Sequence, residues 1–413
     1  MPSIHDAYIR HAIHYFRELD AANDRYIAGG GGQIWALEQF DREDANIRSA
    51  QRWLSDVVEG IVQESVVVHD VGKAALELCN VYPDGGAYLI SLRLTSQERI
   101  EWLKVALLAS EYLQRHITTQ AHLGNLGLAY YELGRNRDAI TYFEKAQKVA
   151  SEINDRRHEG TWLGNIGMAY AALGEHQRAI SYYEQHLSIA REIGDQRGEA
   201  NALGNLGVAH AATGEVENAY SAYRQQLEIA REIGDQRGES NALLNIGLVS
   251  LDRGDFQEAR RYFERCMVIA RSMGDRFTEG LALGSLAHTF IGLDDYDRAN
   301  EHLVAAIQIA RQTGNRRSEV RHLSVQVMAY RMLGEYQMGI ECGENALAIA
   351  REIESASEAA FISWQLGLIY EKIGDINMAL DFFQANADYE KSIDHPAAAK
   401  SIAKIQRLRS QLE

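Results

Sequence analysis

Proline and cysteine are both scarce in this chain. Its 413 residues include 3 prolines and 3 cysteines. With 46% hydrophobic and 24% charged residues, the composition matches neither a collagen, nor a proline-rich protein, nor a disordered chain. We therefore expect a folded and mostly helical protein.

The three cysteines are Cys79, Cys266 and Cys342. They lie too far apart for a CxxC metal or redox motif, and they are too few for a disulfide framework. No apolar run approaches the roughly 18 residues that cross a bilayer, and the start of the chain lacks the order of a secretory signal. These absences together predict a soluble, cytoplasmic protein in a reducing compartment.

Positive charge is in deficit as well. Lys and Arg number 42 against 58 Asp and Glu, so the formal net charge is −16. A protein whose main partner is a polyanion needs an excess of cations. The charge therefore argues against nucleic acid or an acidic membrane as a partner, although local basic patches stay open.

Catalytic motifs are missing from the sequence. It has no Gly-x4-Gly-Lys-Ser/Thr loop, no Gly-x-Ser-x-Gly elbow and no HExxH pair. His11 and His14 lie one helical turn apart near His5, but surface histidines explain them better than a zinc site does. The run Gly29–Gly32 is better explained as a linker than as an anion cradle. We expect no enzyme activity, no cofactor and no metal.

A 40-residue repeat dominates the rest of the chain. GNLGLAYYELG at 124–134 recurs as GNIGMAYAALG at 164–174, GNLGVAHAATG at 204–214 and LNIGLVSLDRG at 244–254. The same register gives weaker copies at 284–294, 324–334 and 364–374. Seven units of 40 residues therefore fill 121–400.

Each unit has the pattern of two helices. In the second unit, two sets of small or apolar residues recur at steps of three and four, which places each set on one helical face: Leu163, Ile166, Gly167, Tyr170 and Leu173, then Ala179, Tyr183, Leu187 and Ala190. Gly174 interrupts the first helix, Gly194 ends the second, and Asp195 is placed to cap the next. The acids at the unit junctions, such as Asp195 and Glu199, are therefore expected to be structural. A hairpin this small cannot bury both faces alone, so neighbouring hairpins must stack into a solenoid.

This pattern resembles the tetratricopeptide repeat. The resemblance rests on a small residue in the first helix, an aromatic three positions later, an alanine in the second helix and an aromatic after it: Gly127, Gly167, Gly207, Gly247 and Gly367; Tyr130, Tyr170 and Tyr370; Ala139, Ala179, Ala219, Ala259, Ala299 and Ala379; Phe143, Tyr183, Tyr223, Phe263 and Phe383. It implies an all-α, right-handed α-solenoid of stacked helix-turn-helix units.

The chain departs from the family in three ways. Its units have 40 residues instead of 34, the proline between units is absent, and units five and six carry Ala287 and Val327 in place of the glycine. Such long units are similar to those of kinesin light chains, spindle-orientation adaptors and bacterial STAND-type regulators.

The first 120 residues are less regular. Helices are expected at 4–28 and 33–58, and a degenerate hairpin at 70–80 and 96–116 around a turn at Pro83–Gly86. The predicted organisation is therefore a helical segment (1–68), a degenerate repeat-like hairpin (69–120), seven repeats (121–400) and a helical tail (401–413). The stretch ALEQFDREDANIRSAQRWL resembles the segment that joins STAND (NB-ARC-like) regulators to their repeat arrays, notably at Asp44, Asn46, Ile47, Arg48, Ala50, Trp53 and Leu54.

The face of each first helix opposite its apolar stripe is the candidate binding surface, which we call the first-helix face. In tetratricopeptide arrays these helices line the concave groove. We predict that the partner-binding residues on this face are Asn125, Asn165, Asn201, Asn205, Asn241, Asn245, Leu128, Met168, Leu248, His288 and Arg321. Four of them, Asn125, Asn165, Asn205 and Asn245, recur once per repeat and are the ladder asparagines.

A carboxamide carries donors and an acceptor, which suits the alternating groups of an extended peptide backbone. The resemblance implies the same, because asparagine rows hold peptide backbones in related arrays. The alternative is that these amides only satisfy groups between adjacent helices. Beyond Asn245, His288, Arg321 and Arg331 add positive charge and Phe361 and Trp364 add apolar area, which would suit an acidic ligand with an apolar anchor. Sequence drift in the later units would explain the same residues.

The sequence therefore predicts a scaffold that binds a protein or peptide segment in its groove, without direct contact with nucleic acid or membrane. Two alternatives remain. One is the ligand-sensing half of a STAND signalling ATPase or transcription regulator, and the other is a scaffold that self-associates into homo-oligomers.

Overall fold

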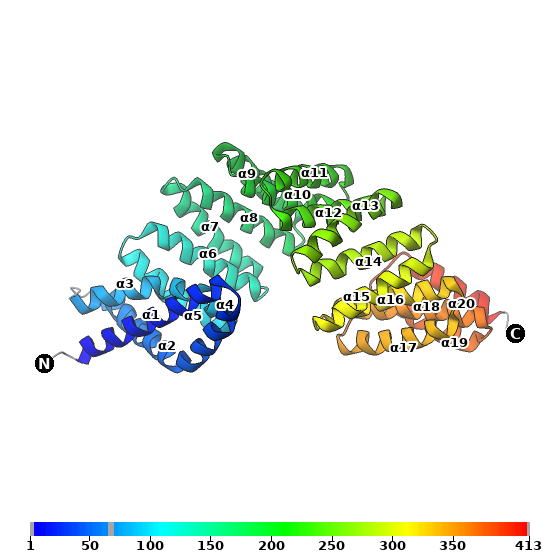
Figure 1. Ribbon diagram of the computed structural model, residues 1–413, viewed down its shortest axis with the longest axis horizontal. Helices are drawn as coiled ribbons and strands as arrows, with labels where there is room; N and C mark the ends of the chain where they lie inside the picture. Colours follow the sequence, from blue (N-terminus) through cyan, green and yellow to red (C-terminus); the bar gives the residue numbers. More distant parts are fainter. Residues whose placement is uncertain (1–3, 65–69, 411–413) are drawn as a thin grey trace. The chain divides into compact units, whose positions relative to one another are not determined.

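The computed structural model describes residues 4–64 and 70–410, and over these residues every regular element is a helix (Figure 1). The expected all-α fold is confirmed. The chain divides into two compact units, residues 1–215 and 216–413, and each is described by itself. Residues 1–3, 65–69 and 411–413 of the predicted segments lie outside the described residues.

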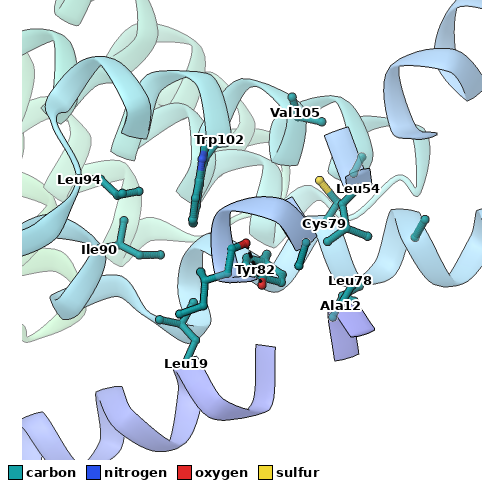
Figure 2. Packing of buried hydrophobic residues seen from close by; sticks show 14 of the residues in the cluster. Ala12, Leu19, Leu54, Leu78, Cys79, Tyr82, Ile90, Leu94, Trp102 and Val105 are labelled. Carbon is teal, nitrogen blue, oxygen red and sulfur yellow. Dashed lines mark hydrogen bonds between the residues drawn. The ribbon is translucent and has the colours of Figure 1, made fainter. Parts of the chain in front are cut away.

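Five helices form the start of the first unit: α1 (Ile4–Ala28), α2 (Gly31–Glu64), α3 (Asp70–Gly85), α4 (Ala87–Arg93) and α5 (Ser96–Tyr112). They enclose a core of their own, in which Tyr82 is fully buried and packs against Trp102, 6.0 Å between ring centroids (Figure 2). The hydroxyl of Tyr82 donates to the carbonyl of Ile47, 3.4 Å away. This contact ties α3 to α2.

The predicted turn at Pro83–Gly86 is wrong in part. Helix α3 continues through Pro83 to Gly85, and a separate short helix, α4, follows Gly86. A Cβ built at Gly85 would lie 2.5 Å from the ring of Phe16, so α1 packs directly on this backbone. Packing of the buried residues Tyr82 and Pro83 outweighs the local helix-breaking tendency of proline.

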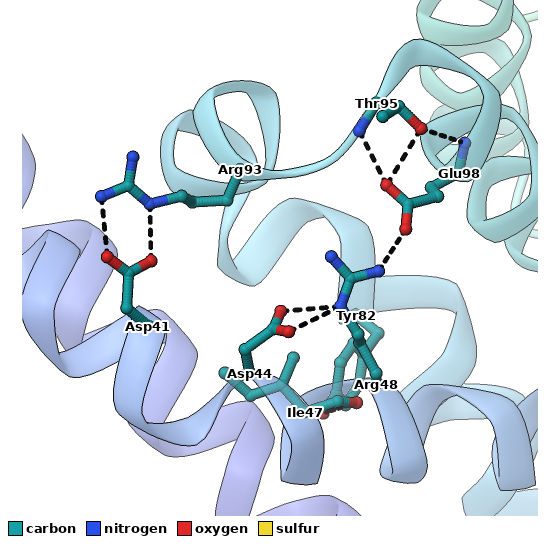
Figure 3. Close-up of polar contacts among 8 residues, drawn as sticks. All are labelled: Asp41, Asp44, Ile47, Arg48, Tyr82, Arg93, Thr95 and Glu98. Carbon is teal, nitrogen blue, oxygen red and sulfur yellow. Dashed lines mark hydrogen bonds and ion pairs between the residues drawn. The ribbon is translucent and has the colours of Figure 1, made fainter.

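A set of ion pairs joins α2 to the helices that follow it (Figure 3). Arg48 pairs with Asp44 at 2.7 Å and also with Glu98 of α5. Glu98 in turn forms a capping box with Thr95 at the start of α5. Three of the residues that carry the STAND-like resemblance therefore have structural contacts here: Ile47 is buried, and Asp44 and Arg48 lie in this network.

Helical hairpins fill the remainder of the first unit. They are formed by α6 (His116–Glu132), α7 (Asn136–Glu152), α8 (Arg156–Ala172) and α9 (His176–Ile193), followed by α10 (Gln196–Ala212). The predicted boundary at residue 121 falls inside α6.

The second unit consists of α11 (Val216–Glu232), α12 (Gln236–Asp252), α13 (Phe256–Ser272), α14 (Arg276–Gly292), α15 (Tyr296–Gln312), α16 (Arg316–Leu333), α17 (Tyr336–Glu352), α18 (Ala356–Ile373), α19 (Ile376–Ser392) and α20 (Ala398–Arg409). Along the whole chain the first helices begin at residues 116, 156, 196, 236, 276, 316 and 356, which is the predicted 40-residue step. The predicted tail helix begins at residue 398 instead of 401.

The residues that end and start the helices act as expected. Gly174 and Gly194 have φ values of 76° and 68°, a left-handed conformation that glycine adopts without strain. The carboxylate of Asp195 accepts from the backbone N–H of Gly198 at 3.1 Å. Asp235, Asp275 and Asn315 cap their helices in the same way.

Buried glutamates link successive hairpins at two junctions of the second unit. Glu319 of α16 pairs with Arg316 of its own helix and with Arg311 of α15, both at 2.7 Å. Glu279 of α14 is bound likewise by Arg276 and Arg271. The acids at the repeat junctions therefore serve the architecture. Among the described helices, none is long and apolar enough to span a bilayer.

Candidate ligand cleft on the first helices

The second unit contains an open cleft across three successive first helices, α12, α14 and α16. Its volume is about 680 Å³. The lining residues come from these helices and the cap of α16: Leu244, Leu248, Leu251, Asp252, Phe277, Leu281, Gly284, Ser285, His288, Asn315, Arg317, Ser318, Arg321, His322 and Val325. A cleft of this size falls within the range of ligand-binding sites in proteins.

The cleft brings together three of the predicted partner-binding residues, Leu248, His288 and Arg321. Four further lining residues come from the same three first helices: Asp252, Leu281, Ser285 and Val325. Asn241 is exposed and Asn245 half-buried on the same α12, but neither lines the cleft. The role of the asparagines in this unit therefore stays a prediction.

The chemistry of the cleft is divided between apolar and cationic groups. Leu248 is 37% exposed and Phe277 is 55% exposed, so both offer apolar area to a ligand. The side chains of Arg317 and Arg321 are exposed and form no ion pair with any residue that the structure describes. The acid Asp252 lies on α12, whereas both arginines belong to α16.

Two imidazoles complete the lining. A Cβ built at Gly284 would lie 2.3 Å from Cε1 of His322, so the ring of His322 packs directly on the backbone of α14. Burial, Arg321 and His288 together lower the pKa of His322 to about 4. Burial and then Arg321 lower the pKa of His288 as well. Both rings are therefore neutral near pH 7 and can either donate or accept a hydrogen bond.

His322 lacks a partner within the described part of the chain. Its ring is only 5% exposed, yet it makes no side-chain hydrogen bond to a described residue. Buried polar groups are normally hydrogen-bonded. A buried ring that borders the cleft and has no internal partner is therefore available to a ligand.

In the first unit, none of the predicted asparagines makes a side-chain hydrogen bond to a described group. Asn125, Asn165, Leu128 and Met168 are half-buried, and Asn201 and Asn205 are exposed. Asn125 also lines a small cleft of about 90 Å³ with Arg99 and Trp102. None of these amides is fully buried, and whether they bind a partner or serve the architecture stays a prediction.

Sequence reasoning missed Phe277, Arg317 and His322. Phe277 precedes Leu281, and Arg317 precedes the predicted Arg321, by four residues, which is one helical turn on the same face. Extending the predicted face by one turn toward the helix start would have found both. His322 follows Arg321 directly and reaches the cleft only because Gly284 leaves room for its ring. The described residues hold no cluster of three or more His, Cys, Asp or Glu side chains that could bind a metal.

This protein consists of stacked helical hairpins with an open cleft on their first helices. It therefore belongs to the class of helical-repeat proteins, which includes tetratricopeptide repeats. A family model described as a tetratricopeptide repeat matches residues 118–192, 198–272 and 239–312. These segments carry tetratricopeptide repeats, as the resemblance in the sequence implies. A second model, for anaphase-promoting complex subunit 5, matches residues 291–372. No curated protein matches the chain.

Solved structures share the fold. A STAND signal-transduction ATPase with a tetratricopeptide-repeat sensor, from Pyrococcus horikoshii, is 16% identical with a TM-score of 0.61 over 89% of this chain. This chain spans 55% of that protein's length. The apo quorum sensor NprR from B. thuringiensis is 18% identical (TM-score 0.59, 86% of this chain and 97% of NprR). Aspartyl phosphate phosphatase F from Bacillus subtilis is 14% identical (TM-score 0.55, 91% and 94%). At these identities the likeness establishes the fold alone.

Proposed function

We propose that the repeat array binds an extended segment of a partner protein along its first helices, and that it acts by binding and not by catalysis. The observation that carries this proposal is the cleft across α12, α14 and α16. It is open, it is lined by the predicted first-helix face, and it combines apolar side chains with cations that have no partner in the described residues. Such a surface suits a binding protein whose own side chains cover the apolar residues and pair with the unpaired cations.

The asparagines of the first unit support the same proposal. Asn125, Asn165 and Asn205 recur at a 40-residue step on α6, α8 and α10. Asparagine is an unfavourable residue inside a helix, so its recurrence without an internal hydrogen bond needs another reason. Each amide can exchange two hydrogen bonds with the backbone of a bound strand.

The test is a double substitution, Asn165→Leu with Asn205→Leu. Twelve-residue peptides selected from a displayed library on the wild-type protein serve as ligands, and calorimetry measures their affinity. We expect the variant to lose at least about tenfold in affinity, because each lost pair of hydrogen bonds contributes roughly 1 kcal/mol or more. Helical circular dichroism and melting should stay near wild type, since both amides lack partners within the described residues.

The matched control is Thr141→Leu with Ser181→Leu. These exposed residues also lie 40 positions apart, but on the second helices α7 and α9. The control should bind like wild type. If melting of the asparagine variant collapses while affinity per folded molecule persists, the amides are architectural and the ladder hypothesis fails.

A second candidate function is supported by the fold match to a STAND protein with a tetratricopeptide-repeat sensor. In this case the cleft would bind an activating ligand and pass the signal to an ATPase domain. The candidate requires such a domain to be encoded with this chain. A peptide that binds the cleft should then change the rate of ATP hydrolysis by the two domains together, and an unchanged rate would rule the sensor role out.

A further inference from the structure

The end of the cleft formed by α16 differs from the rest of its lining. Arg317 and Arg321 lie one helical turn apart on this helix, and neither is paired with a described carboxylate. By contrast, Arg311 and Arg316, at the junction that precedes this face of α16, are both neutralised by Glu319. Two unneutralised guanidinium groups side by side form a local cationic site in a chain whose net charge is −16.

Neutral hydrogen-bonding groups surround these two cations. Ser285, His288, Ser318 and His322 all line the same cleft. The ring of His322 is 5% exposed and has no hydrogen-bond partner in the described chain. Carboxylates prefer sites that combine guanidinium groups with further donors, because charge-assisted hydrogen bonds are about twice as strong as neutral ones.

The opposite part of the cleft is apolar. Leu244, Leu248 and Leu251 come from α12, and Phe277 and Leu281 from α14. A ligand that fills the cleft must therefore carry an apolar body next to its anionic group. The carboxylate of Asp252 lies on α12 and would repel an anion placed there, so the anionic group belongs at the α16 end.

We propose that this cleft holds an acidic residue of the partner segment, with the carboxylate between Arg317 and Arg321 and a neighbouring aliphatic or aromatic side chain against the leucines of α12. The inference rests on the proposed function in one respect: the proposed function makes a peptide segment the source of the carboxylate. A free amphipathic acid shares the same chemistry, so the experiment separates the two sources.

The test compares two peptides that differ by one charge, N-acetyl-Leu-Glu-Phe-amide and N-acetyl-Leu-Gln-Phe-amide. Calorimetry with the full chain at low salt should give at least about tenfold tighter binding for the Glu peptide. The double variant Arg317→Gln with Arg321→Gln should bind both peptides alike. A second pair of probes, 4-phenylbutyrate and 4-phenylbutyramide, reports on free acids.

The control variant is Arg261→Gln, an exposed arginine on the second helix α13 that does not line the cleft. It should keep the preference for the Glu peptide. Because Arg317 and Arg321 have no ion pair to lose in the described chain, the double variant should melt like wild type.

Three outcomes would overturn the inference. Equal affinity for the two peptides and for the two small probes would show that no carboxylate site exists, while the asparagine test of the proposed function would still stand on its own. A preference for 4-phenylbutyrate without a preference between the peptides would assign the cleft to free acids. That result would remove the peptide as its occupant and would count against the proposed function in this unit. A preference that survives in the double variant would place the site elsewhere.

Discussion

At the scale of single residues, glycines decide how closely the two helices of a hairpin approach. A Cβ built at Gly167 would lie 2.6 Å from Cε1 of Tyr183 on the facing helix, and Gly247 meets Phe263 in the same way. Side chains at these positions would separate the helices. Gly60 in α2 has no atom within 4 Å of the corresponding position, so glycine there contributes nothing to packing.

Substituting Gly167 should therefore destabilise the protein. We expect Gly167→Ala to lower the free energy of unfolding, and Gly167→Leu to lower it by about 1–3 kcal/mol or more, because overpacking forces the helices apart. Gly60→Ala should instead raise it by up to about 1 kcal/mol, since alanine is the better helix former. Denaturant melts measure all three. A Gly167→Leu protein as stable as wild type would show that the helix register is wrong.

The buried histidine of the cleft should make stability depend on pH. The pKa of His322 in the folded protein is about 4, against an ordinary value of 6.5, owing to burial, Arg321 and His288. Between these values the unfolded chain binds more protons than the folded one, so stability is lost as the pH falls from about 6.5 toward 4. The loss from this ring is on the order of 2 kcal/mol by pH 5.

The check is a series of melts between pH 7 and pH 4.5. His322→Gln should flatten the acid side of the curve relative to wild type, and His116→Gln, a substitution of an exposed ring at the start of α6, serves as the control. An identical pH dependence in wild type and His322→Gln would mean that this ring does not set the acid limit.

At the scale of helices, an ion pair that joins two helices and one within a single helix differ in how exposed the carboxylate is. Glu319 is 3% exposed and joins α15 to α16 through two arginines. Glu228 is 65% exposed and reaches Arg224 of the same helix at 4.0 Å. Because burial removes the competition with water, the carboxylate of Glu319 contributes to stability, whereas that of Glu228 contributes little.

We expect Glu319→Gln to lower the free energy of unfolding by about 1–3 kcal/mol, because two arginines lose a charged acceptor. Glu228→Gln should change it by less than about 0.5 kcal/mol. Urea melts of both variants make the comparison. Equal small effects would indicate that Arg311 and Arg316 are fully satisfied by water.

The expectations from sequence were most accurate at this scale. Helix starts repeat every 40 residues as predicted, because glycine and Asp or Asn caps act within a few residues of themselves. The prediction failed where tertiary contacts override local preference, as at Pro83, which lies inside α3 against α1. The first-helix face as a binding surface stays a prediction, and only the structure locates a cleft on part of it.

At the scale of the whole molecule, a final helix covers the last hairpin of the array. Helix α20 covers the last hairpin, with Ile405 and Leu408 buried against Phe383 and Ala387 of α19. Lys404 of α20 is also paired with Glu371 of α18 at 2.6 Å. Repeat arrays need such a capping element because an uncovered hairpin exposes its apolar face.

Detaching α20 should cause self-association. We expect Ile405→Asp with Leu408→Asp to raise light scattering with protein concentration, because the apolar face of α19 becomes exposed. The control, Ala403→Asp with Gln406→Asp, places two carboxylates on the exposed side of the same helix. Strong concentration-dependent scattering by the wild-type protein itself would instead support the self-associating scaffold.

The amino-acid sequence alone determined the helical class, the repeat length and the caps, because these follow from interactions between residues close in the chain. Only the tertiary structure decided that the cleft opens across α12, α14 and α16, that His322 enters it over Gly284, and that Arg317 and Arg321 stay unneutralised there. Such features depend on the spacing between helices 40 residues apart. That spacing is set by the size of every side chain packed between the helices, and local pattern does not encode it.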